Sequence, residues 1–402
     1  MEGYSLSLKG SQKRSTDIIV VGAGLAGSTA AAVLGQQGWR VLLVDPRPSC
    51  PPVFKAEKIE PEQAASLRKF GLLSHIAPQA VRIREVRTYY NGRLFRTTAI
   101  EQYGLYYCDM VNAMRAHLPA SVEFKLGRVV QIVNSPELQR VKLDRDEECT
   151  CRLVVLASGL SAEIQSSLRL RRTIIQKNQS VAIAFTIARR DGLPFLFDAV
   201  TYYPTSCADS LDYLTLFPIG QTMRANLFAF RNATDPWVRQ FTSEPGQMLE
   251  RCLPKLSRTI GEYRVASKVE SSRIDLYRTE GDPPPGVVLI GDASQNVCPS
   301  TAMGLSKVFT DVDVLCSECI PLWFGSPGMD SDKVMSFCNH PRKRATDVKA
   351  LQNALYRRHT STLRSLRWRV HRLRLHLSMQ FRRPNRGANL PQTARKRLFG
   401  DD

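Results

Sequence analysis

The chain has no long, purely apolar run. Its longest uncharged segment, residues 18–39, is interrupted by glycines and two glutamines. A membrane-spanning helix needs about 20 predominantly apolar residues. The first 16 residues also lack the apolar core of a secretory signal peptide. We therefore expect a cytoplasmic protein, peripheral to a membrane at most, in which residues 1–16 are a disordered lead-in.

Closely spaced metal ligands are lacking as well. The ten cysteines are scattered, and the C-x-x-C of Cys316 and Cys319 has no second pair of cysteines or histidines to complete a zinc site. The sequence therefore predicts no metal, and without a secretory signal the cysteines are expected to be free thiols. No catalytic triad is recognisable, so the catalytic residues stay unassigned.

Acidic residues are scarce relative to basic ones, and the imbalance is concentrated at one end. The chain has 56 Lys and Arg against 37 Asp and Glu, a net charge of +19. Residues 341–402 carry +14 of this charge, which leaves +5 for the first 340 residues. The composition indicates an ordinary globular body with a basic C-terminal region.

What the chain does have is a glycine motif between two buried strands. Residues 18–21 (IIVV) predict a buried parallel strand, a G-x-G-x-x-G motif follows, and residues 28–34 favour a helix. A second strand over residues 40–44 ends at Asp45. This order of strand, turn, helix and strand is typical of dinucleotide-binding folds. The alternative is a glycine-rich turn in an ordinary α/β unit.

The residues of the motif have predicted mechanical roles. Gly22 permits the tight turn, Gly24 lets the backbone approach a pyrophosphate, and Gly27 lets helix and strand pack closely. The N-terminus of the helix offers free N–H groups and a partial positive charge to the phosphates. Asp45 stands where a carboxylate can accept hydrogen bonds from ribose hydroxyls.

A second constellation lies at residues 286–313. A buried strand over residues 287–290 delivers Asp292 to the end of a sheet, and Pro299 and a helix beginning at Gly304 follow. An aspartate in this place can hold a ribityl hydroxyl. The amides of the helix N-terminus can face the pyrimidine end of an isoalloxazine and stabilise negative charge on reduced flavin.

The two motifs together resemble those of the flavoprotein monooxygenases of the p-hydroxybenzoate hydroxylase type. The resemblance covers roughly residues 17–350 and extends to flavin-dependent halogenases and geranylgeranyl reductases. It implies FAD as the cofactor and oxygen transfer through a flavin hydroperoxide. The residues that it assigns to cofactor binding are Gly22, Gly24, Leu25, Ala26, Gly27, Asp45, Lys58, Val130, Gly291, Asp292, Pro299, Gly304 and Leu305.

Some of these assignments leave alternatives open. Lys58, like its neighbours Lys55 and Glu57, could be a solvated charge on a loop, and Val130 could be a plain core residue. Cys298 is interpreted as part of the wall near the flavin ring rather than as a nucleophile.

The chain departs from the family at its middle motif. Family members usually carry Asp-Gly followed by Ser and Arg there, in contact with FAD and the nicotinamide donor. Here the segment is Ala157-Ser158-Gly159-Leu160-Ser161, with Gln165 about where the Arg would stand. NADPH, NADH and a partner reductase therefore stay open as the electron source. Halogenases and prenyl-chain reductases share the outer frame with altered middle motifs.

The predicted fold is α/β: a Rossmann-like FAD-binding domain with an inserted, mostly antiparallel β-sheet substrate domain and a C-terminal helical basic tail. Within it, Asn91-Gly92 predicts a hairpin turn. The predicted boundaries are 17–172 and 281–340 for the two parts of the FAD-binding domain, 173–280 for the substrate domain, 341–383 for the basic helical region and 384–402 for a disordered tail.

The basic region has apolar residues at helical spacing, with arginines on the other faces. The apolar residues are Leu363, Leu366, Val370, Leu373 and Leu377. This pattern fits a helix packed on the body of the protein or a helix lying on an anionic membrane surface. Nucleic-acid binding is the least favoured interpretation.

The sequence thus predicts an FAD-dependent monooxygenase that hydroxylates or epoxidises a small aromatic, polyketide or isoprenoid substrate, as in secondary metabolism. The alternatives are a prenyl-chain reductase or a flavin-dependent halogenase on the same fold. From another class, an RNA- or membrane-binding flavoprotein also fits. The expected partners are a lipophilic or aromatic small molecule, a reductase and, through the tail, an anionic membrane surface.

Overall fold

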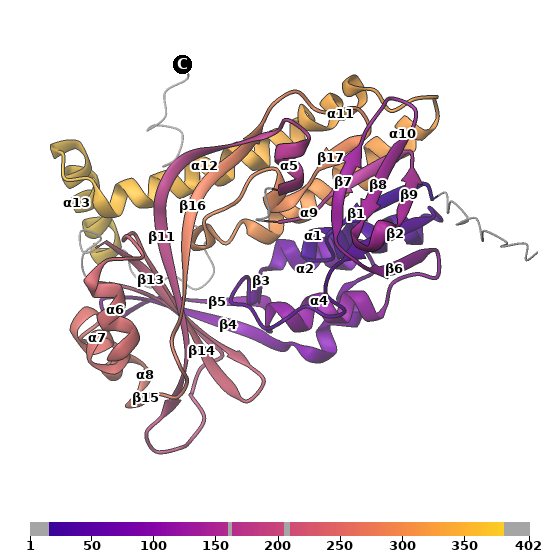
Figure 1. Ribbon diagram of the computed structural model, residues 1–402. Helices are drawn as coiled ribbons and strands as arrows, with labels where there is room; N and C mark the ends of the chain where they lie inside the picture. The colour runs from indigo at the N-terminus through magenta and orange to yellow at the C-terminus, as the bar shows by residue number, and fades with distance from the viewer. Residues whose placement is uncertain (1–15, 160–162, 205–209, 382–402) are drawn as a thin grey trace, which may run out of the picture.

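The parallel sheet predicted at the two cofactor motifs is present in the structure, a computed structural model that describes residues 16–159, 163–204 and 210–381. Its five strands have the order β17-β10-β1-β2-β6 (Figure 1). They are β1 (Ile18–Val21), β2 (Val41–Asp45), β6 (Val122–Leu126), β10 (Leu153–Leu156) and β17 (Val287–Leu289). Because β1, β10 and β17 run parallel, the two motifs that follow β1 and β17 lie at the same edge of the sheet.

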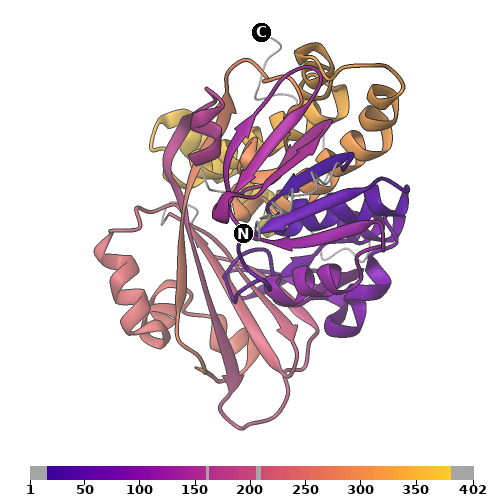
Figure 2. The same cartoon turned by 45° about the vertical axis from the view of Figure 1, so that its right-hand side comes forward.

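Both faces of this sheet are covered, which explains why its strands are apolar throughout rather than alternating. Ile18 and Val20 pack with one set of helices, whereas Ile19 and Val21 face a separate three-stranded sheet (Figure 2). The helices are α1 (Leu25–Gln36), α4 (Tyr107–Ala116) and α9 (Gly304–Val314). The strands are β7 (Val129–Val133), β8 (Gln139–Leu143) and β9 (Glu148–Cys151). Short helices α2 (Pro61–Lys69), α3 (Leu73–Ile76) and α5 (Glu163–Ser167) complete this part.

A second, larger sheet has the order β15-β11-β14-β13-β12-β4-β5-β3, with β16 paired to β11. It is mostly antiparallel, as predicted, and β12 with β4 is its parallel pair. Its strands are β3 (Lys58–Ile59), β4 (Val81–Tyr90), β5 (Arg93–Gly104), β11 (Arg171–Arg189), β12 (Ala199–Tyr203), β13 (Leu211–Ile219), β14 (Thr222–Ala229), β15 (Tyr263–Val265) and β16 (Glu270–Glu280).

This sheet extends beyond the predicted segment 173–280, because β3, β4 and β5 come from the segment assigned to the FAD-binding domain. The predicted hairpin is confirmed: β4 pairs with β5, and the turn residues Asn91 and Gly92 have φ values of 49° and 78°. Positive φ at both positions suits a type I′ turn. Alternation of apolar side chains identifies a strand with one buried face but does not say which sheet the strand joins.

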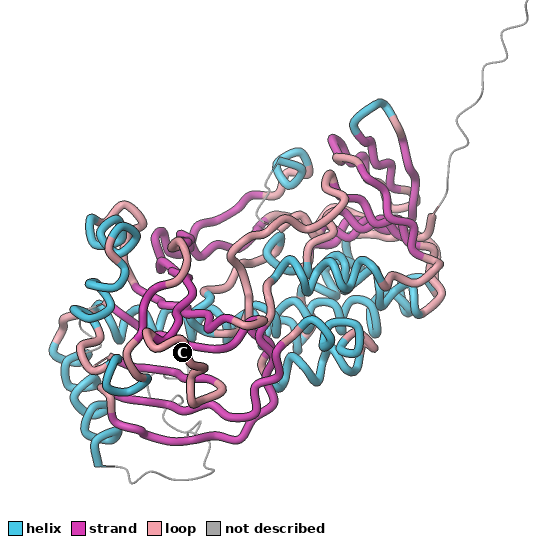
Figure 3. The backbone as a smooth tube through the Cα atoms, turned by 90° about the horizontal axis from the view of Figure 1, so that it is seen from below, coloured by secondary structure: helices cyan, strands magenta, loops and turns pink. Residues whose placement is uncertain are grey.

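The long β11–β16 ribbon connects the two halves of the molecule (Figure 1). The chain leaves the FAD-binding half at Arg171 and returns at Glu280, and these two residues are paired in the ladder. Seen from below, the strands gather toward opposite ends of the molecule, and a run of helices lies between the two groups (Figure 3). The outer face of the large sheet packs on α6 (Pro236–Ser243), α7 (Pro245–Cys252) and α8 (Leu256–Ile260).

The described part of the C-terminal region, residues 320–381, contains the four helices named below, and the structure corrects the prediction that the apolar residues from Leu363 onward share one helix face. Helix α12 ends at Thr362, and Leu363 has an extended backbone between α12 and α13. The four are α10 (Ile320–Phe324), α11 (Ser331–Cys338), α12 (Pro341–Thr362) and α13 (Leu366–Phe381). Helix α12 packs across α9 and the large sheet. No helix within the described ranges is both long and apolar enough to cross a membrane.

Candidate active site

A single cavity of about 1990 Å³ joins the two motifs to the large sheet. On one side it is lined by the glycine loop after β1, the end of β2, the loop after β17 and the N-terminus of α9. On the other side it is lined by strands of the large sheet. Since both motifs and the sheet open onto one space, a bound cofactor and a substrate can meet there.

The glycine loop has the close contacts that its predicted roles require. Gly22 has a φ of +98°, and a Cβ there would lie 2.6 Å from the carbonyl oxygen of Ala157. A Cβ on Gly27 would lie 1.8 Å from the carbonyl oxygen of Gly22, so α1 packs directly on the loop. Gly24 differs, because the nearest atom to its Cβ position is the hydroxyl of Tyr107 at 3.3 Å. Gly24 lines the cavity, so the space beside its Cα opens into the cavity.

Two residues of α4 complete this end of the cavity and were missed by the sequence analysis. The Tyr107 hydroxyl accepts a hydrogen bond from the Leu25 amide at 3.1 Å. Burial raises the pKa of Tyr107, so its own proton stays available to donate. Arg115 donates from Nε to the Ala23 carbonyl at 2.8 Å and lines the cavity. Both belong to a helix with no glycine or phosphate motif, so no sequence signal marked them.

Asp45 lies at the cavity, but its carboxylate is already engaged with the chain. Its Oδ2 accepts from the Ala23 amide at 2.8 Å and its Oδ1 from the Arg47 amide at 2.9 Å. The guanidinium of Arg115 lies 3.7 Å from Oδ2. Asp45 therefore fixes the glycine loop, and its remaining lone pairs are available to a ribose hydroxyl.

The loop after β17 is held in place at successive backbone atoms. The Gly291 amide donates to Asp311 at 2.8 Å, and the Asp292 carbonyl accepts from the Tyr277 hydroxyl at 3.0 Å. The Ala293 carbonyl accepts from Gln165 Nε2 at 2.9 Å, so the residue at the family's Arg position is buried and serves the loop. A Cβ on Gly291 would lie 3.0 Å from Cβ of Ala26, which shows how closely the two motifs approach.

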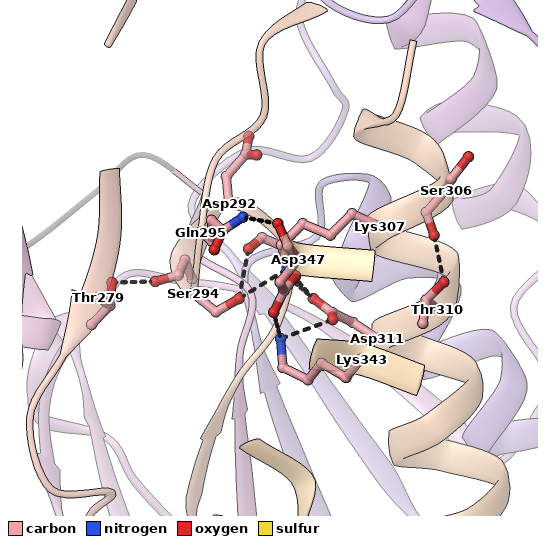
Figure 4. A network of polar contacts seen from close by, with 12 residues as sticks. Thr279, Asp292, Ser294, Gln295, Ser306, Lys307, Thr310, Asp311, Lys343 and Asp347 are labelled. Atoms are coloured by element: carbon pink, nitrogen blue, oxygen red, sulfur yellow. Dashed lines mark hydrogen bonds and ion pairs between the residues drawn. The ribbon is translucent and has the colours of Figure 1, made fainter. Parts of the chain in front are cut away.

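Behind this loop lies a cluster of two lysines and two aspartates, of which Lys307, Lys343 and Asp311 are buried and Asp347 is partly exposed (Figure 4). Lys307 donates to Asp311 at 2.7 Å and to Ser294 at 3.0 Å. Lys343 of α12 donates to Asp311 at 3.1 Å and to Asp347 at 2.8 Å. Burial works to raise the pKa of Asp311, but the two lysines outweigh it and hold that pKa below its usual value. The cluster fixes the loop that presents Asp292, whose carboxylate extends away from it (Figure 4).

One face of the large sheet forms the opposite wall of the cavity. On β4, β12, β13 and β14 the wall residues alternate along the strand, as expected when one face of a sheet is turned to a cavity. Its apolar and aromatic residues stand among polar ones such as Thr88, Thr201 and Thr215, and they include Val86, Tyr90, Ile100, Tyr203, Tyr213, Phe217 and Phe228. The Tyr213 hydroxyl donates to the Ser300 carbonyl at 2.9 Å and ties this wall to the loop beside Pro299.

Glu57 lines the cavity and belongs to a buried ion pair with Arg224, which stands behind the wall. Arg224 donates to Glu57 through Nε at 2.9 Å and through Nη2 at 2.8 Å, and it also contacts Glu270. Burial raises the pKa of Glu57, and the bonds from Arg224 oppose that shift. Glu57 is thus a paired group and not the solvated loop charge that was the alternative. Next to it, Asn226 lines the cavity, and its buried Oδ1 has no hydrogen-bond partner among the described residues.

The remaining predicted residues divide into those at the cavity and those away from it. Leu25, Ala26, Lys58, Pro299, Gly304 and Leu305 line it, together with Gly22, Gly24, Asp45 and Asp292. Gly27 and Gly291 support the lining from behind. Val130 is not among the lining residues, and its side chain, on β7, is 53% exposed, so it is not a core residue either. Cys298 is fully buried behind the wall, between Ser180 and Ser300. Leu160 and Ser161 lie outside the described residues.

The cavity fits an FAD on two local observations. The Gly24 edge is open to the cavity apart from one hydroxyl, and a Cβ on Gly304 would meet nothing within 4 Å. Both glycines stand at helix N-termini, those of α1 and α9, and neither helix has an acidic residue in its first turn. Two backbone positions are therefore open for close approach, each at a positive helix end that suits a phosphate or an electron-rich ring.

Comparison with solved structures finds the same fold in several flavoproteins. The p-nitrophenol 4-monooxygenase PnpA from Pseudomonas putida DLL-E4 superposes with a TM-score of 0.71 at 18% identity, over 90% of this chain and 93% of that one. The flavin-dependent brominase Bmp2 gives 0.66 at 17% identity, over 90% and 93%. PqsL from P. aeruginosa, solved in complex with 2-aminobenzoylacetate, gives 0.67 at 17% identity, over 86% and 97%.

The fold and the cavity define the class of the protein as an FAD-dependent oxidoreductase. A search of curated protein sequences finds no match. The chain belongs to the FAD binding domain family, whose sequence profile matches residues 15–320.

Proposed function

We propose that the protein is an FAD-dependent monooxygenase that hydroxylates or epoxidises a small lipophilic or aromatic molecule. The observation that carries the proposal is the continuous cavity, which has the two FAD motifs at one side and a sheet face with many aromatic side chains at the other. When bound, reduced FAD would supply the chemistry by reacting with O₂. The residues of the chain then need only bind, orient and exclude water.

The cofactor would be held by the glycine loop after β1 and the loop after β17, both of which are fixed by hydrogen bonds. The Gly24 edge, the N-terminus of α1 and the Tyr107 proton suit a pyrophosphate. The Asp292 carboxylate, on its clamped loop, suits a ribityl hydroxyl. The N-terminus of α9 at Gly304 suits the pyrimidine end of the ring.

The substrate would lie between that ring and the large sheet. Its apolar body would contact side chains such as Phe217 and Phe228, which keep water from the reacting atoms. The buried Oδ1 of Asn226 would accept a hydrogen bond from a hydroxyl or amine of the substrate, because an unpaired buried acceptor is costly. The aromatic side chains would hold the substrate without fixing its orientation, and the hydrogen bond to Asn226 would fix it.

The test is oxygen incorporation. The purified, FAD-loaded protein is reduced, mixed with a panel of phenols, polyketides and isoprenoids, and exposed to ¹⁸O₂. We expect a product that contains one ¹⁸O atom, with the heat-denatured protein as the control. Consumption of O₂ without any labelled product from the whole panel would contradict the proposal for these substrate classes.

The altered middle motif supports a second candidate, halogenation or reduction on the same fold. Gln165 is occupied with the Ala293 carbonyl, and Bmp2, named a brominase, has a similar fold. The same assay run with bromide distinguishes the reactions, because a halogenase gives a brominated product in place of an ¹⁸O-labelled one. A prenyl-chain reductase would saturate its substrate without O₂.

A further inference from the structure

Helix α13 presents an apolar stripe to the outside. Leu366, Val370 and Leu373 are 75%, 38% and 56% exposed. Their spacing of four and three residues places them on one side of the helix. Exposed apolar residues that stand singly need no explanation, but three in register on one helix are a surface that water solvates poorly. The stripe is therefore a candidate docking surface.

The opposite side of α13 is fastened to the body, so the outward direction of the stripe is fixed. Trp368 packs against the rings of Tyr356 and His359 of α12, with centroids 6.1 Å and 5.7 Å away. The Tyr356 hydroxyl and His371 Nε2 are hydrogen-bonded at 2.8 Å. Leu375, also on this side, lines the active-site cavity. The helix thus separates the cavity from the stripe.

The flanks of the stripe are basic. Arg364, Arg367, Arg369 and Arg374 are exposed, and the sequence has no acidic residue between Asp347 and Asp401. On a helical projection Arg367 and Arg374 lie along one edge of the stripe and Arg369 along the other. Apolar side chains between arginines are the arrangement of helices that lie in the interface of a bilayer, where the cations meet anionic headgroups.

We propose that α13 docks the protein on an anionic lipid surface, with Leu366, Val370 and Leu373 inserted and the arginines at the headgroups. Two other occupants fit less well. A second copy of the chain would bring two dense basic surfaces together, and a nucleic acid would leave the leucines unused. Docking in this orientation places the cavity about one helix diameter, roughly 10 Å, from the lipid. This short distance suits a lipophilic substrate taken from the membrane. Only this link to the substrate rests on the proposed function.

The test is co-sedimentation of the full-length, FAD-loaded protein with vesicles, which needs no substrate and no turnover. Phosphatidylcholine vesicles are compared with vesicles that also contain phosphatidylglycerol, each at low and high salt. We expect binding to the anionic vesicles at low salt, weakened by high salt. The variant Arg367→Gln/Arg369→Gln should bind roughly 25-fold more weakly, since each arginine near such a surface contributes about a factor of five.

The leucine variant separates insertion from simple charge attraction. Leu366→Ser/Leu373→Ser keeps every charge and should still lower binding by roughly tenfold for each leucine, because the apolar contact is lost. The matched controls are Leu322→Ser, on a residue that is 77% exposed on α10, and Arg140→Gln/Arg264→Gln, which removes two exposed charges elsewhere. Both controls should bind like the unaltered protein.

Three results would overturn the proposal. The first is no binding of the full-length protein to anionic vesicles at low salt. The second is unchanged binding of the leucine variant, with equal binding to RNA, which would make the surface a general polyanion site. The third is a dimer in light scattering that the leucine variant abolishes and that anionic vesicles do not compete away.

Discussion

At the scale of single residues, the cavity is built by side chains and glycines whose roles differ even within one motif. Gly22 and Gly27 have backbone atoms within 3 Å of their Cβ positions, so their substitution disturbs the fold itself. Gly24 has only the flexible end of Tyr107 nearby, and its freedom serves the cavity. Three glycines of one motif should therefore fail in two different ways.

The first prediction separates these roles. Gly24→Val should leave a folded protein that no longer retains FAD, because the side chain would fill the space open to a pyrophosphate. Gly27→Ala should instead lower stability, since the Cβ would overlap the Gly22 carbonyl oxygen. Flavin absorbance and thermal unfolding measure the two effects, and Gly246→Ala, which meets nothing within 4 Å, is the control. Full flavin content in Gly24→Val would contradict the placement of the cofactor.

The second prediction concerns Asp292. Asp292→Ala should weaken FAD retention by roughly 1.5–3 kcal/mol, the value of a hydrogen bond to a charged group. Its carboxylate lines the cavity, while its backbone is held independently by Tyr277, so the loop should keep its shape. Titration of the apoprotein with FAD measures the change. The exposed Asp282→Asn serves as the control, and equal affinity in both variants would argue against a ribityl contact.

The third prediction concerns substrate orientation. Asn226→Leu should raise KM for a hydroxylated substrate while FAD content stays unchanged, because it removes the unpaired buried acceptor but keeps the bulk of the side chain. For an analogue that lacks the hydroxyl, KM should be the same in the variant and in the unaltered protein. If the variant loses both substrates equally, the effect is one of shape and the assigned hydrogen bond is wrong.

At the scale of elements, the position of the loop after β17 depends on helices from two other parts of the chain. Asp311 and Lys307 come from α9 and Lys343 comes from α12, and the three meet directly behind Gly291. Breaking a buried charge pair by removing one partner is costly because the other charge stays desolvated. The position of the loop that presents Asp292 therefore depends on the packing of α12 against the body of the protein.

The fourth prediction uses this coupling and its pH dependence. Asp311→Asn should destabilise the protein by about 3 kcal/mol at neutral pH, because two buried lysines lose a counter-charge. The pKa of Asp311 is lowered in the folded state, so its stabilisation is present above the unfolded-state pKa of about 3.9 and is lost as pH falls through the folded value. The free energy of unfolding, measured with urea between neutral and acidic pH, should therefore fall less steeply with decreasing pH in the variant than in the unaltered protein. The control is Asp282→Asn, at an exposed residue. If the two variants had the same dependence of unfolding free energy on pH, the stabilising role of Asp311 would be contradicted.

At the scale of the whole molecule, the two C-terminal helices differ in what they hold together. Helix α12 inserts Lys343 into the buried cluster and pairs Arg357 with Asp212 of β13 at 2.6 Å, so it joins the two halves. Helix α13 rests mainly on α12 through Trp368 and His371. The body of the protein should therefore depend on α12 far more than on α13.

The fifth prediction tests this difference by truncation. A chain ending at Leu363 should fold and retain FAD, because it keeps every lining residue except Leu375. A chain ending at His340 should aggregate, since it loses Lys343 and exposes the surface that buries Ala350 and Ala354. Flavin content of the soluble fraction and thermal melts provide the measurement. A yellow, stable protein without α12 would show that the buried cluster is dispensable.

The sequence determined the parallel sheet, the glycine turn and the order of the two motifs, because uniformly apolar strands and positive-φ glycines are local requirements that few other structures satisfy. It did not determine that β4 and β5 would join the large sheet, that Tyr107 and Arg115 would reach the glycine loop, or that Glu57 would be paired with Arg224. Nor did the helical spacing show that the helix is interrupted at Leu363 and that the apolar stripe of α13 is exposed. These are contacts between segments distant in sequence, and only tertiary packing decides which of many similar amphipathic surfaces and charged side chains meet.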